Sequence, residues 1–316
     1  MDAHVLTIVL ALLAACANGA ASVLQRKANL QQDAQGRDGR RGSGRRGVPG
    51  LVRPVLRLVG RPLWAAGMGA LALSGALQAT ALAVGRLSVV QPLMATELLF
   101  TLMAGTVVFS HRPDGRTWLW FLALAAGLAV FLIAAAPSEG QPTAVTDGWL
   151  RAGPPLAALM AVLWLAGRAL RGAAARAGVL GCATATGFAC TAALIKDVTG
   201  RIPDGPGALV TAWQLYAAAA VGLLSLVMLQ ATLRAGTLAA SQPALTLGDA
   251  LLSVVLGWVL FGERIALGTH LGPELAGVAL MAAGVVGLSR SPALSGGWDT
   301  PERERTPAPA RAARHD

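Results

Sequence analysis

Apolar residues form long blocks along this chain, and short polar segments separate the blocks. Nine blocks can be followed, roughly at 5–24, 63–84, 88–109, 118–136, 155–170, 178–195, 208–229, 237–261 and 267–288. About 20 residues of helix are needed to cross the hydrocarbon core of a bilayer. The pattern therefore predicts an all-α integral membrane protein with about nine transmembrane helices.

Composition agrees with this prediction. The chain is 54% hydrophobic and only 13% charged, whereas a soluble domain carries about 25% charged residues. The cysteines Cys16, Cys182 and Cys190 lie inside apolar blocks, where they are expected to act as small packing residues. Their spacing fits neither a metal site nor a disulfide framework. We therefore expect no resident metal and no cofactor.

The chain has a net charge of +10, and its basic residues are unevenly distributed among the segments between the apolar blocks. If the N-terminus lies outside, 21 of the 26 Lys and Arg residues fall in segments that face the cytoplasm. This is the bias that orients membrane proteins. No Lys or Arg precedes the first apolar block, which favours an uncleaved helix over a secretion signal. We expect a multi-pass plasma-membrane protein with its N-terminus outside and its C-terminus in the cytoplasm.

One stretch of the chain occurs twice. The first copy runs from Leu-Gln-Ala-Thr at 77–80 to His111-Arg112, and the second from Leu-Gln-Ala-Thr at 229–232 to Glu263-Arg264. Further matching pairs are Glu97 and Asp249, Thr101 and Ser253, Gly105 and Gly257, and Phe109 and Phe261. Because these pairs recur at four-residue steps, acid, hydroxyl and glycine share one helix face in both copies.

The repeat extends to the other helices and implies opposite orientations. The only two lysines, Lys27 and Lys196, end the first and sixth apolar blocks. Matching helices are five apart, so each crosses the membrane in the opposite sense to its counterpart. We predict two inverted four-helix repeats, 1–136 and 177–288, joined by a connector helix within 137–176. Inverted repeats are typical of secondary transporters, although an Ala- and Leu-rich chain also resembles itself by chance.

One polar segment lies within the first repeat, and another follows the second repeat. The basic cytoplasmic loop 25–62 has a polar first half, 31–47, which is expected to be disordered. Its second half, 48–62, has the pattern of a short interfacial helix, and a solvated loop is the alternative. The Pro- and Arg-rich tail, 289–316, is predicted to be a disordered cytoplasmic segment.

Glu97 and Asp249 are the main candidate site residues. Each lies near the middle of an apolar helix, where a charge costs about 2.5–3.5 kcal/mol. A proton, a cation or burial within the bundle has to offset that cost. We expect the two acids to bind a substrate or a coupling ion, with Thr101 and Ser253 beside them. A purely structural, protonated acid is the alternative.

Other polar residues in the apolar blocks are weaker candidates. Pro92 and Pro243 remove a backbone donor one turn before each acid, and the resulting helix break exposes carbonyls or else is a simple packing kink. The neutral candidates for substrate or ion contact are Gln91, Gln242, Gln78, Gln230 and Asn18. Hydrogen bonds between helices are the alternative role for these side chains.

The motifs resemble a known family. Pro243 followed by an apolar helix that ends Phe261-Gly262-Glu263-Arg264 resembles the EamA-type repeat of the drug/metabolite transporter superfamily. Val23-Leu-Gln-Arg-Lys27, Trp64 and Val89-Val-Gln-Pro-Leu93 resemble its NIPA-type magnesium transporter branch. The first repeat departs from the pattern, because Ser110-His111 replaces Gly-Glu. The superfamily implies transport of small metabolites, and the branch implies transport of divalent cations.

These observations favour a permease that moves a small metabolite or a cation by alternating access between the repeats. The chain carries no phosphate-binding loop and no metalloprotease motif, so we expect neither an enzyme nor an ATP-driven pump. Membrane lipid is an expected partner, nucleic acid is not, and a homodimer remains open. The rival functions are a membrane-embedded lipid enzyme, for which no nucleophile–base pair is found, and a non-transporting scaffold.

Overall fold

The computed structural model describes residues 3–42, 62–109, 114–135, 140–144, 147–235, 238–263 and 271–290. Within these residues the chain is helical, with no strand and with nine spans long and apolar enough to cross a membrane. In order they are α1 (Ala3–Gly42), α3 (Pro62–Val84), α4 (Leu87–Met94) with α5 (Glu97–Phe109), α6 (Gly115–Ala135), α7 (Gly148–Ala169), α8 (Ala173–Thr199), α10 (Trp213–Ala235), α11 (Leu238–Phe261) and α12 (Leu271–Ser289). The short helices η1 (Ile202–Asp204) and α9 (Pro206–Thr211) connect α8 to α10. The predicted fold class is confirmed.

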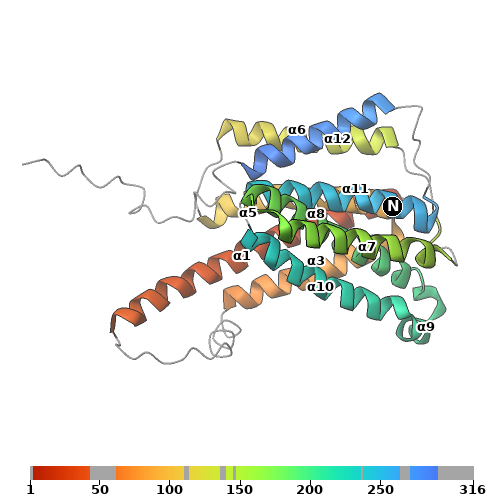
Figure 1. Cartoon of the computed structure of the whole chain (residues 1–316), viewed down its shortest axis with the longest axis horizontal. Coiled ribbons are helices and arrows are strands. Elements are labelled where there is room, and N and C mark those ends of the chain that lie inside the picture. Colours follow the sequence, from red (N-terminus) through yellow and green to blue (C-terminus); the bar gives the residue numbers. More distant parts are fainter. Residues whose placement is uncertain are drawn as a thin grey trace, which may run out of the picture.

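Each half is organised around its first helix. In the first half α1 packs against α3, α4 and α5, and in the second half α8 packs against α10 and α11. The connector α7 also lies on α8. Figure 1 shows α6 and α12 side by side along one edge of the bundle, with α3 and α10 towards the opposite edge.

The burial pattern of α3 and α10 shows which of their positions are equivalent. Both helices have 23 residues, and a shift of 151 superposes the buried Gly67, Ser74 and Ala81 of α3 on the buried Ala218, Ser225 and Thr232 of α10. The buried Ser74, which donates to Ala14 O of α1, then matches the buried Ser225, which lies against Gly187 of α8. The two Leu-Gln-Ala-Thr segments, 152 apart, are therefore one residue out of structural register. The identical residues of these segments are therefore not at equivalent positions, because the buried face of a helix decides which residues are equivalent.

The pair α6 and α12 shows that the halves are inverted. A Cβ at Gly127 would lie 2.5 Å from Met281 N, and one at Gly284 would lie 2.5 Å from Leu124 N. Gly284 lies 157 residues after Gly127, and Met281 lies 157 residues after Leu124, so the two contacts are equivalent. Because the later residue of one helix meets the earlier residue of the other, the helices run antiparallel. Glycine permits this close approach of helices in a membrane. Equivalent helices of opposite direction are what an inverted repeat requires.

The third span is broken, whereas its counterpart is continuous. The N–H groups of Ala95 and Thr96 donate to Pro92 O and Leu93 O, three residues back, at 3.1 Å each. This turn separates α4 from α5 and follows Pro92, which itself lies inside α4. The prediction of a second break at Pro243 is wrong, because α11 runs through it. Pro243 is only the sixth residue of α11, so the helix loses a single hydrogen bond near its start.

The prediction that residues 31–47 are disordered is wrong up to Gly42, where α1 ends. Once a helix is nucleated in the membrane, each added residue costs little. Gln and Arg, which supply six of the twelve residues 31–42, are good helix formers, although three glycines are interspersed with them. The rest of that segment, the candidate interfacial helix at 48–61 and the tail beyond Arg290 lie outside the described residues.

Candidate functional site

Glu97 begins α5 immediately after the helix break, and Asn18 of α1 donates a hydrogen bond to its carboxylate through Nδ2. The neighbouring Gly19 makes this contact feasible. A Cβ at Gly19 would lie 2.6 Å from Thr101 N and 2.9 Å from Phe100 C. The backbones of α1 and α5 are therefore almost in contact beside Glu97. Asn18, a weaker candidate from the sequence, is the direct partner of the first acid.

Asp249 provides the second acid from α11. Its Oδ1 accepts a hydrogen bond from Ser253 Oγ at 3.5 Å, one turn along the same helix. The side chain is half-buried, as is that of Glu97. The two carboxyl groups lie close enough to interact electrostatically. The structure thus brings together Glu97, Asp249, Asn18 and Ser253, which the sequence singled out separately.

Two carboxylates that approach each other inside a membrane have a specific chemical consequence. Their repulsion is much stronger in a medium of low dielectric constant than in water. Each carboxylate therefore disfavours a negative charge on the other, which favours a proton on one of them or a cation nearby. The site can therefore exchange a proton or a cation, and it offers only oxygen and amide groups as ligands.

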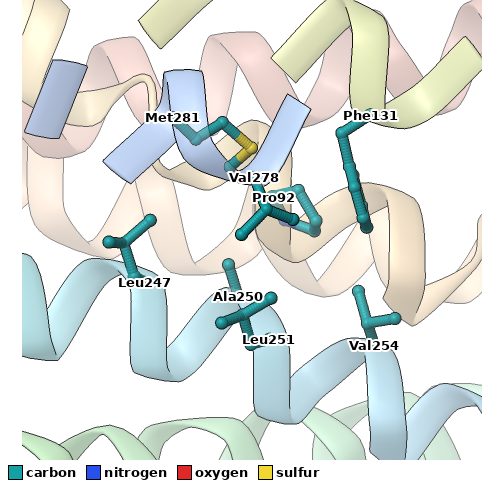
Figure 2. A pocket seen from close by; sticks show the side chains of 8 residues that line it. All are labelled: Pro92, Phe131, Leu247, Ala250, Leu251, Val254, Val278 and Met281. Atoms are coloured by element: carbon teal, nitrogen blue, oxygen red, sulfur yellow. The ribbon is translucent and has the colours of Figure 1, made fainter. Parts of the chain in front are cut away.

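The first candidate proline, Pro92, lies against a small apolar pocket of about 10 Å³, shown in Figure 2. Helices α4, α6, α11 and α12 meet there, and every lining side chain is apolar: Pro92, Phe131, Leu247, Ala250, Leu251, Val254, Val278 and Met281. Polar groups do not line this pocket, so it is not the polar cavity that the helix break suggested. Gln91 beside it is buried on α4.

The glutamines on the second and seventh spans do not join the acids. Gln230 is exposed on α10, and Gln78 is half-buried on α3. Neither helix packs against α5 in the described part of the chain. Thr101 is half-buried at the contact between α5 and Gly19. Gln242 belongs to α11, but its side chain lies outside the described residues.

A second polar cluster, built on Lys196 and Glu263, closes the bundle at the end where α3 meets α4. Glu263 is fully buried, and its carboxylate accepts hydrogen bonds from Leu87 N at 2.8 Å and Ser88 N at 2.9 Å. Lys196 Nζ lies 3.4 Å from Glu263 Oε1 and donates to Gly85 O at 2.7 Å. The carboxylate therefore caps the first turn of α4, where the helix dipole favours a negative charge.

Glycines make room for this buried carboxylate. Gly262 has φ +63°, which ends α11 and turns the chain so that Glu263 points back into the bundle. A Cβ at Gly257 would lie 2.4 Å from Glu263 Oε2, and one at Gly140 would lie 2.7 Å from Glu263 Cγ. The N–H of Gln141 also donates to Phe261 O at 2.7 Å. Residues 140–144 thus form a cover over the ion pair.

A polar vestibule of about 700 Å³ lies at the same end of the bundle. Its basic lining residues are Lys196, Arg86 and His4, and Arg86 approaches His4 Nε2 to 3.0 Å. On the predicted topology this is the outer face. Lys196, which lines this vestibule, connects it to the buried Glu263.

Asp197, next to Lys196, is a second buried acid with several partners. Its side chain is fully buried and accepts hydrogen bonds from Trp149 Nε1 at 2.7 Å, Gln214 Nε2 at 3.1 Å and Ala144 N at 3.3 Å. Arg201 pairs with it at 3.4 Å. These contacts join α7, α8, α10 and the cover at 140–144, so Asp197 fixes the position of the connector helix.

Glu263 and Asp197 were not among the site residues expected from the sequence. Gly262-Glu263 was visible at the end of a helix, but its hydrogen-bond donors lie about 175 residues away. Asp197 lies outside the repeated stretch, whose second copy runs from 229 to 264. Among the described residues, no group of three or more His, Cys, Asp or Glu side chains could hold a metal ion.

Comparisons with known proteins provide one relative. A protein of Corynebacterium glutamicum, described only as uncharacterized, is 28% identical over 212 residues, which cover 67% of this chain and 73% of the relative. No family model matches the chain, and no solved structure matches it. The relative's description names no activity, so the function has to be inferred from the site.

Proposed function

We propose that this chain is a secondary transporter of the plasma membrane that moves a small metabolite or a cation by alternating access. The observation that carries the proposal is the electrostatic interaction between Glu97 and Asp249, two half-buried acids at matching positions of the repeat. Binding sites of such transporters lie where the repeats meet. The resemblance of the helix endings to the EamA-type repeat of the drug/metabolite transporter superfamily supports the same class.

The acids and the ion pair have separate roles in this mechanism. Glu97 and Asp249 exchange a proton or a cation with the substrate, because neutralising one of them removes their repulsion. Lys196 and Glu263 close the end that the charge bias assigns to the outside. Opening towards that side must separate Glu263 from the N–H groups of Leu87 and Ser88.

The test is a flux assay in proteoliposomes with a panel of radiolabelled metabolites, with and without an imposed pH gradient. Glu97→Gln and Asp249→Asn are expected to abolish flux that the wild-type chain supports. Asp147→Asn is the matched control, because Asp147 is an exposed acid next to α7. Full activity in both site variants would disprove the mechanism.

A divalent cation such as Mg²⁺ is the second candidate substrate, and the oxygen-rich site favours it. Two carboxylates, the Asn18 amide and the Ser253 hydroxyl are hard ligands of the kind that Mg²⁺ and Ca²⁺ prefer. Uptake of Mg²⁺ followed with an entrapped fluorescent indicator separates the two candidates. If Mg²⁺ enters only with the wild-type acids and no metabolite moves, the cation is the substrate.

A further inference from the structure

A large groove lies at the end of the bundle opposite the Lys196–Glu263 pair, between the start of α6 and the end of α12. About 500 Å³ of it can hold water-sized molecules. From α6 it is lined by Asp114, Arg116, Thr117 and Trp120, and from α12 by Ala283, Val286, Gly287 and Arg290. One end of the groove is therefore charged, and the remainder is apolar.

Helix packing defines the wall of the groove. The Trp120 ring lies on Gly287 so closely that a Cβ there would be 2.0 Å from a ring atom. One turn earlier, Gly284 lies against the backbone of Leu124. Because the antiparallel helices are held together by these glycines, the groove between their ends is part of the fold. Tryptophan is also the residue that favours the boundary between headgroups and hydrocarbon.

Two arginines approach this boundary from different helices. Arg116 and Arg290 are both exposed and both line the groove. Asp114 also lines the groove, and its carboxylate caps α6. It accepts hydrogen bonds from the Thr117 hydroxyl and from Thr117 N at 3.1 Å. These bonds, with a smaller contribution from Arg116, lower the pKa of Asp114, so it remains ionised and committed to the cap.

We propose that this groove binds one anionic phospholipid, with its phosphate between Arg116 and Arg290 and an acyl chain along Trp120 and Ala283. The charge bias of the loops assigns this end to the cytoplasmic leaflet. Basic pockets between transmembrane helices on that side are suited to anionic headgroups. The apolar part of the groove distinguishes a lipid from a soluble phosphate ester, which would leave it empty.

The test uses native mass spectrometry of the purified chain with phosphatidylglycerol, phosphatidylcholine or soluble glycerol phosphate. One phosphatidylglycerol is expected to stay bound preferentially. The double variant Arg116→Gln/Arg290→Gln should weaken its affinity roughly 30-fold, from the contributions of two basic residues near an anionic surface. Arg168→Gln/Arg171→Gln, which changes two exposed arginines in the last turn of α7 and just after it at the same end, is the matched control.

A second variant tests the acyl-chain seat with both arginines in place. Ala283 is exposed within the groove, so Ala283→Trp fills it without disturbing the core and is expected to displace the lipid. Equal retention of phosphatidylcholine, equal loss in the control pair, or full retention in Ala283→Trp would overturn the proposal. Binding of glycerol phosphate as tight as that of the lipid would also overturn it. None of these readouts depends on transport.

Discussion

Lys27 and Lys196 occupy equivalent places in the two inverted halves, at opposite ends of the bundle. Lys27 Nζ donates to Val108 O near the end of α5 at 3.4 Å, and Lys196 Nζ lies 5.1 Å from the centre of the Phe261 ring at the end of α11. Val108 corresponds to Leu260 in the repeat, so Lys27 reaches the end of α5 and Lys196 reaches the end of its counterpart α11. Only Lys196 is paired with a buried carboxylate among the described residues, and this makes the two ends of the bundle different.

Removing one member of the Lys196–Glu263 pair should strongly destabilise the fold. Lys196→Met leaves Glu263 buried without its cation, and breaking a buried pair in this way costs about 3–5 kcal/mol. Lys27→Met is the matched control, with an expected cost of about 0.5–1.5 kcal/mol for one hydrogen bond. The measurement is the free energy of unfolding in detergent micelles. Equal losses in the two lysine variants would show that the pair has no special weight.

Gly257 should tolerate no side chain, because the Glu263 carboxylate occupies the space of its missing Cβ. Gly257→Ala places a methyl group 2.4 Å from Glu263 Oε2, so the carboxylate has to leave Leu87 N and Ser88 N. We expect a loss of about 1–3 kcal/mol, the cost of unpaired buried groups. Gly75→Ala on α3 is the control, since nothing lies within 4 Å of a Cβ there. The measurement is the midpoint of thermal unfolding of each variant. A midpoint of Gly257→Ala at or above that of Gly75→Ala would show that the Glu263 carboxylate does not need the space beside Gly257.

The spans and their inversion could be predicted from the sequence because lipid imposes a simple rule. A helix in a bilayer must satisfy its own backbone and present apolar side chains, so hydrophobic blocks mark the spans directly. The pairing of Glu97 with Asp249 followed from a repeat in the same helix face. The one-residue error between α3 and α10 arose because Leu-Gln-Ala-Thr matched in letters, whereas Ser74 and Ser225 match in burial.

Contacts between distant segments could not be predicted in this way. Glu263 bonds with backbone N–H groups, which every residue except proline carries, so nothing at Leu87 or Ser88 identifies them as its partners. Gln230 fails as a site residue for the opposite reason. It is polar within an apolar helix, but the side of α10 on which it lies is exposed. Burial, and not residue type, separates these two cases.

Asp197 should matter for stability more than its exposed neighbour Asp204. Asp197→Ala leaves Trp149 Nε1, Gln214 Nε2 and Ala144 N without their acceptor, and each unsatisfied buried group costs about 1–3 kcal/mol. Asp197→Asn should be intermediate, because an amide keeps one acceptor oxygen but turns an NH₂ group towards the other donors. Asp204→Asn on η1 is the control. Unfolding free energies that rank Asp197→Ala equal to Asp204→Asn would contradict the role of this acid.

If the proposed transport mechanism holds, Asn18 should affect it more than Ser253. Asn18 donates a hydrogen bond to the Glu97 carboxylate, whereas Ser253 reaches Asp249 only at 3.5 Å, near the limit of a useful hydrogen bond. Because a bond to an ionised group is worth about 1.5–3 kcal/mol, Asn18→Ala should shift the proton or cation affinity of Glu97 by roughly 10–150-fold. The pH dependence of flux in proteoliposomes measures this shift. Ser253→Ala should change the affinity read from the pH profile by no more than about threefold relative to wild type. An unchanged profile in Asn18→Ala would show that the hydrogen bond from Asn18 does not affect proton or cation binding at Glu97.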